Sequence, residues 1–279
     1  MDIREMTSAD LDFAISLTEA EGWSSIKRDF EELLLFDPNG NFVGEEEGVP
    51  IGMVCALSYG HFASIGNLIV VNEFRGQGKG AELMEHAMEY VKNKGTDVLM
   101  LDSVPAAVPL YERLGFNKVC RSLRLAGRIE PRRSLKIRPM EGRDLMHILS
   151  IDRKHFGASR FLFISNGLAA CPEFSSVAEV DNEIVGYMMG SERHGHVRLA
   201  PWIMSAHAEL AEEFLRDFAV EAGGLEIRAG VLETSRRAIG VYKACGLVEK
   251  GHSWRMVRGT REKIEFSDRI YAIGSPMRG

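Results

Sequence analysis

The feature that most constrains the fold of this chain is an internal repeat. The segment IREMTSADL, from Ile3 to Leu11, returns 134 residues later as IRPMEGRDL, from Ile137 to Leu145. Near the same spacing IGM (51–53) is echoed by VGY (185–187), and LYERLGF (110–116) is echoed by VYKACGL (241–247). Three echoes in one order predict a duplicated domain. The charged segment from Gly127 to Ser134 separates the copies, which gives expected domains of 1–128 and 134–279.

Each half predicts the order strand, helix, helix, strands, helix, strand, helix, strand, which is a mixed α/β layer. In the first half the strands are expected at 3–6, 41–46, 49–57, 68–71, 97–101 and 116–125. The helices are expected from Thr7 or Ser8 to about Gly22, and at 26–36, 81–91 and 106–114. The Asp37-Pro38-Asn39-Gly40 turn separates the helix at 26–36 from the strand at 41–46, and Glu47-Gly48 joins that strand to the next in a hairpin.

A glycine-rich turn joins the apolar run Leu68–Val71 to the helix that follows it. The turn reads RGQGKG, from Arg75 to Gly80, and the helix after it is apolar along one face. The first turn of a helix leaves backbone N–H groups without partners and carries a partial positive charge. Glycines admit a ligand close to the backbone, so this stretch is typical of a phosphate cradle. Its spacing fits neither the Walker loop nor the dinucleotide fingerprint.

The turn resembles the [RQ]-x-x-G-x-[GA] motif of the GNAT superfamily of acyl-CoA-dependent N-acetyltransferases, with Arg75, Gly78 and Gly80 in its fixed places. The resemblance implies a mixed, mostly antiparallel central sheet flanked by helices in each half. It implies acetyl-CoA as co-substrate. The residues that would hold its pyrophosphate are Arg75, Gly76, Gln77, Gly78, Lys79, Gly80 and Ala81, and the backbone of Ile69, Val70 and Val71 would bond its pantetheine arm.

The second half has no such loop. Ala208-Glu209-Leu210 corresponds to Ala81-Glu82-Leu83, but the spacing is shorter there and no glycine occurs from His196 to Val220. This layout resembles two-domain GNAT proteins whose second domain is degenerate, on segments such as Ala200-Pro201-Trp202 and Arg255-Met256-Val257-Arg258-Gly259. The resemblance covers nearly the whole chain, and it assigns cofactor binding to the first half.

Acyl transfer to an amine needs a neutral amine, a donor to the thioester oxygen and a proton for the leaving thiolate. The resemblance makes Tyr111 the general acid. Glu21, at the end of the first helix, is the expected base, with Asp29 and Asp102 as further options on the acceptor side and a water relay as the alternative to a dedicated base. Trp23 is expected as a wall of the acceptor pocket. Core packing explains Tyr111 and Trp23 equally well in a chain without a ligand. Where the family often has Asn, this chain has Val104, and Asp102 or Ser103 would replace it.

Composition limits the partners of the chain. Its 279 residues carry a net charge of −6, which argues against nucleic acid as the main partner. No apolar run is long enough for a membrane helix, and the beginning MDIREMTSAD is unlike a secretory signal. The four scattered cysteines predict reduced core residues and a cytoplasmic protein. His194-Gly195-His196 lacks a third ligand, so no metal is expected. The sequence leaves a homodimer open.

The expected function is therefore an acetyl-CoA-dependent N-acetyltransferase that acts on a small-molecule or amino-acid-like amine by direct attack in a ternary complex. Deprotonating a lysine side chain at pH 7 costs about 4–5 kcal/mol and an α-amine only about 1 kcal/mol, so an α-amine needs less help. A non-catalytic acyl-CoA-binding sensor or regulatory protein is the alternative. A structural protein that keeps only the fold is a third hypothesis.

Overall fold

The computed structural model describes residues 1–260 and 267–278, and these divide into two compact units. The first unit contains residues 1–119, 255–260 and Arg278, and the second contains residues 120–254 and 267–277. The division expected along the chain was 1–128 and 134–279. Packing instead groups residues 120–128 with the second unit and residues 255–260 with the first.

The sheet of the first unit has the strand order β1-β2-β3-β4-β5-β12. Neighbours from β1 to β4 are antiparallel, and β4 and β5 are parallel. The strands are β1 (Asp2–Glu5), β2 (Asn41–Glu46), β3 (Val49–Ser58), β4 (Ala63–Val70), β5 (Leu99–Ser103) and the end of β12 (Val248–Arg258).

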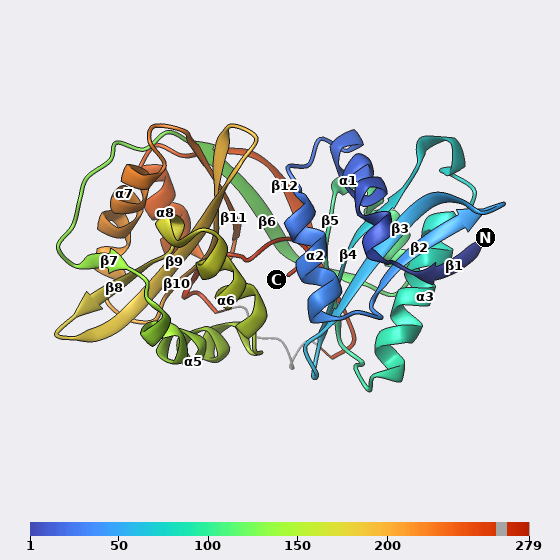
Figure 1. Cartoon of the computed structure of the whole chain (residues 1–279), viewed down its shortest axis with the longest axis horizontal. Helices are drawn as coiled ribbons and strands as arrows, with labels where there is room; N and C mark the ends of the chain where they lie inside the picture. Colours follow the sequence, from blue (N-terminus) through green and yellow to red (C-terminus); the bar gives the residue numbers. More distant parts are fainter. Residues whose placement is uncertain (261–266, 279) are drawn as a thin grey trace. The chain divides into compact units, whose positions relative to one another are not determined.

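Helices cover both faces of this sheet (Figure 1). Every residue of β3 from Ile51 to Leu57 is buried, and successive strand residues point to opposite faces. Against β3 pack α1, α2 and α3, the last through Leu83, Met84, Ala87 and Val91. The helices are α1 (Leu11–Ala20), α2 (Lys27–Phe36), α3 (Lys79–Asn93) and α4 (Val108–Arg113).

The second unit repeats this plan with the strand order β12-β6-β11-β10-β9-β8-β7, and β13 pairs with β10. Its core is centred on the fully buried Trp202, Phe214 and Tyr242. The strands are β6 (Asn117–Gly127), β7 (Ile137–Pro139), β8 (Ser176–Val180), β9 (Glu183–Arg193), β10 (His196–Met204), β11 (Glu226–Leu232) and β13 (Ile270–Ala272). The helices are α5 (Leu145–Phe156), α6 (Phe161–Ala170), α7 (Ala211–Glu221) and α8 (Arg236–Ala244). The predicted fold class, two α/β domains each with a mixed sheet flanked by helices, is confirmed.

The repeated sequence at the start of each half encodes the same local structure. Arg4 Nη2 lies 2.7 Å from Asp10 Oδ1, and Arg138 Nη1 lies 2.7 Å from Asp144 Oδ2. Each aspartate also accepts a bond from the backbone N–H three residues earlier, which caps the helix that follows. The arginine and aspartate of the repeat therefore fix β1 to α1 in the first unit and β7 to α5 in the second.

Each unit completes its sheet with a strand from the other half of the sequence. The outer neighbour of β5 is β12, and β11 pairs antiparallel with β6 from Ile227↔Gly127 to Leu232↔Ser122. In the first unit, Arg255 of β12 donates through Nε to Asp102 Oδ1 of β5, and both side chains are at least 97% buried. This exchange is why the units depart from a simple cut in the chain.

Boundaries of several elements differ from those expected. The helix expected from Ala81 begins at Lys79, two residues earlier, and Ala208–Leu210 is a 3₁₀ turn before α7. All four cysteines are buried. Within the described part of the chain, no helix combines the length and apolarity that crossing a membrane requires.

Candidate functional site

The glycine-rich turn of the first unit presents a row of free backbone donors. Gly76 and Gly78 have φ of +75° and +85°, and Gly78 is the N-cap of α3. The first backbone bonds of the helix come from Ala81 and Glu82, both to the Gly78 carbonyl. The N–H groups of residues 76 to 80 have no acceptor within residues 1–260 and 267–278. Five consecutive donors at a helix N-terminus form an anion cradle.

The glycines keep this cradle open. A Cβ built on Gly76 or Gly78 meets no atom within 4 Å, so these positions face free space. Gly80 lies closer to the protein, 3.8 Å from Leu110 Cδ2 of α4 by the same measure. The space beside Gly76 and Gly78 is therefore open, and the donor set suits the pyrophosphate that the motif predicts.

The basic side chains of the turn are engaged elsewhere. Arg75 donates through Nε to the Val70 carbonyl at 2.7 Å and through Nη2 to Glu21 Oε1. Lys79 pairs with Glu46, which raises the pKa of Lys79 and lowers that of Glu46. The positive character of the cradle therefore comes from the backbone N–H groups and the α3 dipole rather than from these two charges.

The strand before the turn has an open edge. β4 pairs with β5 only at Ala63↔Leu99 and Ser64↔Met100, while β4 itself continues to Val70. The Val71 N–H bonds the Ile51 carbonyl of β3, so alternation turns the backbone groups of Val70 toward the other edge, where its carbonyl meets Arg75. Ile69 pairs with Met53 of β3. Of the three residues expected at the pantetheine arm, Val70 presents its N–H at the open edge.

Tyr111 lies on α4 and is 8% exposed. Its ring packs edge-on against Phe116 at 6.0 Å, and burial raises its pKa to about 12. Its hydroxyl has no hydrogen-bond partner in the described part of the chain. A buried phenol that stays protonated and holds a free O–H can donate a proton.

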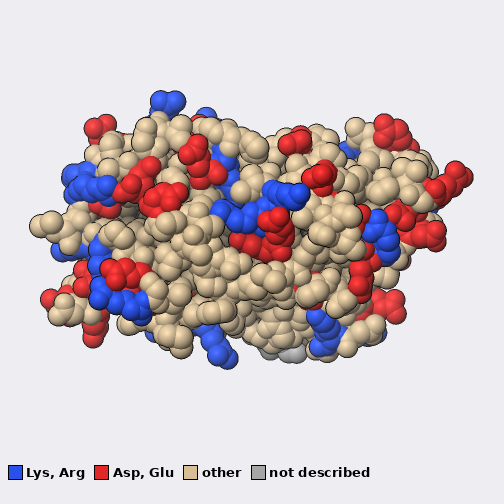
Figure 2. Space-filling view, viewed as in Figure 1, with Lys and Arg blue, Asp and Glu red and all other residues tan. Residues whose placement is uncertain are grey.

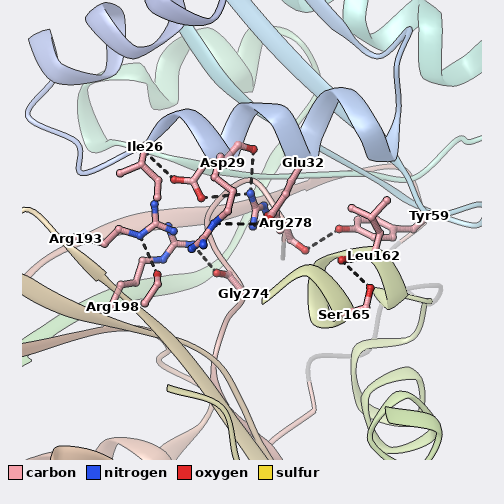
Figure 3. Close-up of polar contacts among 12 residues, drawn as sticks. Ile26, Asp29, Glu32, Tyr59, Leu162, Ser165, Arg193, Arg198, Gly274 and Arg278 are labelled. Carbon is pink, nitrogen blue, oxygen red and sulfur yellow. Dashed lines mark hydrogen bonds and ion pairs between the residues drawn. The ribbon is translucent and has the colours of Figure 1, made fainter. Parts of the chain in front are cut away.

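The acceptor-side residues fall into two groups. Glu21 and Trp23 lie in the connection between α1 and α2, where Trp23 is 37% exposed and Glu21 is held by Arg75. Asp29 caps α2 by accepting from the Ile26 N–H at 3.1 Å, and it lies 3.4 Å from Arg278 Nη2 (Figure 3). Asp102 is buried against Arg255. The structure therefore brings Glu21 to the turn and gives Asp29 and Asp102 structural partners.

Sequence reasoning did not assign a role to Arg255. Arg255 is the first residue of one of the segments that carry the family resemblance, which could have marked it as important. Its position in the sequence does not, however, indicate Asp102 as its partner. Of the two residues offered in place of the missing asparagine, Asp102 is paired with Arg255 and Ser103 donates to the Val104 carbonyl at 2.8 Å, while Val104 itself is 47% exposed. No group of three metal-ligating side chains occurs in residues 1–260 and 267–278; His196 is buried, and its pKa is lowered to about 4 by that burial.

Comparison with known proteins matches both halves. Residues 7–116 match the Acetyltransferase (GNAT) family and residues 148–272 match an Acetyltransferase (GNAT) domain. The chain is 32% identical over 99 residues to an uncharacterized N-acetyltransferase of Methanocaldococcus jannaschii, covering 32% of this chain and 44% of that protein. It is 39% identical over 64 residues to N-alpha-acetyltransferase 30 of Schizosaccharomyces pombe, covering 22% and 41%. The chain thus spans less than half the length of these relatives.

Solved structures share the fold over its full length. A putative acetyltransferase from Pyrococcus horikoshii superposes with a TM-score of 0.84 at 22% identity, covering 100% of this chain and 95% of that one. A GCN5-related N-acetyltransferase from Sphaerobacter thermophilus gives 0.69 at 17% identity, covering 98% and 96%. With the cradle in the first unit and a second unit of the same plan, the chain belongs to the GNAT acetyltransferase family, as a tandem of two GNAT domains.

Proposed function

We propose that the chain is an acetyl-CoA-dependent N-acetyltransferase that acylates the amine of a small-molecule or amino-acid-like acceptor by direct attack in a ternary complex. The observation that carries the proposal is the row of five unpartnered N–H groups at residues 76 to 80. Family membership supports the use of acetyl-CoA. Bound acetyl-CoA would supply the activated acetyl group.

The residues of the first unit divide the remaining work. The N–H groups from Gly76 to Gly80 bind the pyrophosphate, and the Val70 N–H at the open edge of β4 bonds the extended arm. Tyr111 holds a proton at its hydroxyl for the leaving thiolate. General acid catalysis of this kind is typically worth 10²- to 10⁴-fold in rate.

Glu21 is the carboxylate best placed to accept the proton of the amine. The Glu21 side chain is 31% exposed, whereas those of Asp29 and Asp102 are 14% and 0% exposed, and Asp29 also caps α2. Arg75 binds both the Glu21 carboxylate and the Val70 carbonyl, so it positions the base beside the end of β4. Trp23, in the same connection, offers an aromatic wall to the acceptor.

An acceptor with an α-amine fits this arrangement better than a lysine side chain. An α-amine has a pKa of about 7.7–8.0, so about one-tenth of it is neutral at pH 7 and about half at pH 8, and a partly exposed carboxylate suffices as its base. The similarity to a protein named N-alpha-acetyltransferase supports the same choice, although it covers only 22% of this chain. We therefore expect turnover first with amino acids and short peptides that have free α-amines.

The experiment that tests the proposal is calorimetric titration of acetyl-CoA into three proteins. Wild type is expected to bind at micromolar concentration. Gly78→Asp places a carboxylate in the cradle and should weaken binding at least 100-fold. Gly95→Asp is the matched control, because Gly95 follows the other end of α3 with φ of +79° and equally open space around its Cβ. Equal binding by all three proteins, or none by wild type, would end the proposal.

One observation favours a non-catalytic acyl-CoA sensor as the second candidate. Val104 stands at the place where the family often has an asparagine that contacts the cofactor, and its side chain is apolar and half exposed. A sensor would bind acetyl-CoA and lose that binding in Gly78→Asp. It would, however, release no coenzyme A with any amine, and Tyr111→Phe would change nothing.

A further inference from the structure

The second unit contains the counterpart of the open strand edge, in matching register. β10 and β11 run parallel from His196↔Glu226 to Leu199↔Ala229, and β10 then continues to Met204 beyond its last pair with β11. In the first unit β4 continues to Val70 in the same way beyond its last pair with β5. Met204 pairs with Gly186 as Val70 pairs with Gly52, so these two strand ends are equivalent.

In the second unit this opening is filled by the chain itself. β13 pairs antiparallel with β10 at Trp202↔Ala272 and Ile203↔Ile270. The Met204 N–H donates to the Arg269 carbonyl at 3.0 Å. On the other side, the Ile273 N–H donates to the Gly230 carbonyl of β11 at 2.9 Å. β13 thus bonds to both strands at the place where they diverge.

The tyrosine equivalent to Tyr111 uses its hydroxyl in a hydrogen bond. Tyr242 is fully buried, and its hydroxyl donates to the Tyr271 carbonyl of β13 at 3.1 Å. The Tyr271 ring lies 4.7 Å from the ring of Trp202, and Tyr271 is only 1% exposed. The hydroxyl that is free in the first unit therefore holds a peptide carbonyl in the second.

The phosphate cradle has no equivalent beside this strand. The N–H groups of Ser205 and Ala206 both donate to the Val185 carbonyl, at 2.8 and 3.1 Å. Glu209 and Glu212 then occupy the first turns leading into α7. These N–H groups already have an acceptor, and carboxylates at a helix N-terminus repel a phosphate, so this site disfavours phosphate binding.

We infer that β13 is a built-in occupant of the second cofactor groove, a strand of the chain that takes the place of the pantetheine arm. Both are extended chains with amide groups, and both satisfy a free strand edge and a tyrosine hydroxyl. The identification of the groove rests on the proposed function of the first unit. An attached strand faces no loss of translational freedom on docking, so it excludes a dissolved ligand. The chain binds one acyl-CoA, and its second unit is complete without one.

Hydrogen exchange measured by mass spectrometry tests this on the full chain. Amides of residues 202–204 and 269–273 should be slow to exchange without ligand and unchanged by acetyl-CoA. Amides of Val70 and of residues 76–80 should exchange fast and become protected when acetyl-CoA is added. Fast exchange at 269–273 in the ligand-free protein, or protection there that requires acetyl-CoA, would overturn the inference. A chain that binds no acetyl-CoA would refute the proposed function and still leave the ligand-free result decisive.

A mild variant gives a second measurement that does not depend on binding. Tyr242→Phe keeps the ring and removes the bond to Tyr271, so exchange at 269–273 should rise about fivefold, the effect of one hydrogen bond of about 1 kcal/mol. Tyr111→Phe is the matched control and should leave those amides unchanged. Calorimetry should also give one acetyl-CoA per chain in wild type and none in Gly78→Asp. A second site, or no effect of Tyr242→Phe, would count against the strand as occupant.

Discussion

Replacing Arg255 by methionine should lower the free energy of unfolding of the first unit, although Arg255 lies late in the sequence. Arg255 and Asp102 form an ion pair in which the side chains are 3% and 0% exposed. The Arg255 Nη1 group also lies 2.8 Å from Met100 Sδ, so the guanidinium is packed on apolar surroundings. Methionine retains much of the packing volume and removes the charge that compensates the Asp102 carboxylate.

The size of the effect follows from the burial of the carboxylate. Breaking one partner of a buried pair costs about 3–5 kcal/mol, because the other charge stays buried without compensation. With a slope of about 2 kcal/mol per molar urea, the midpoint of unfolding of the first unit should fall by about 2 M. Fluorescence alone would not separate the unfolding transitions of the two units. Peptide-resolved hydrogen exchange along the urea series should therefore report residues 1–119 separately.

Two further proteins make the measurement specific. Asp102→Asn in the Arg255→Met background removes the stranded charge and should recover part of the lost stability. Lys118→Met is the control, because Lys118 and Glu112 pair at 3.1 Å with side chains 40% and 49% exposed, and such pairs contribute less than about 1 kcal/mol. A loss below about 1 kcal/mol in Arg255→Met, equal to that of Lys118→Met, would refute the reasoning.

Two other predictions test the chemistry and the repeat. Tyr111→Phe should lower kcat about 10²- to 10⁴-fold at unchanged acetyl-CoA affinity, while Tyr242→Phe should leave kcat as it is; equal kcat in both would exclude the acid role. Because the pKa of Tyr111 is raised to about 12, wild-type kcat should show no alkaline decline from loss of this proton below pH 11. Arg4 lowers the pKa of Asp10 to about 2, so the pair stabilises above pH 4 and that contribution disappears as pH falls through 2. Asp10→Asn should thus destabilise the first unit at pH 7 and have little effect near pH 2, and Asp144→Asn should do the same in the second unit; a cost that does not change with pH would contradict this.

Basic and acidic side chains are interspersed on the face shown in Figure 2, and the chain as a whole carries a net charge of −6.

The sequence by itself determined the features that depend on neighbouring residues. The repeat predicted two domains of one plan, because Arg4 and Asp10, like Arg138 and Asp144, interact within six positions of each other. The glycine turn predicted the cradle for the same reason, since the free N–H groups and the positive φ values all lie between Gly76 and Gly80.

Only the tertiary structure decided the partners of the charged residues and the strand that pairs with the end of β10 in the second unit. Arg75 pairs with Glu21, Arg255 pairs with Asp102, and β13 pairs with β10. Each of these contacts joins residues more than fifty positions apart in the sequence. Local pattern cannot indicate such contacts, because any of several carboxylates or strand edges would satisfy the same group, and the choice depends on which of them folding brings within hydrogen-bond distance and removes from water.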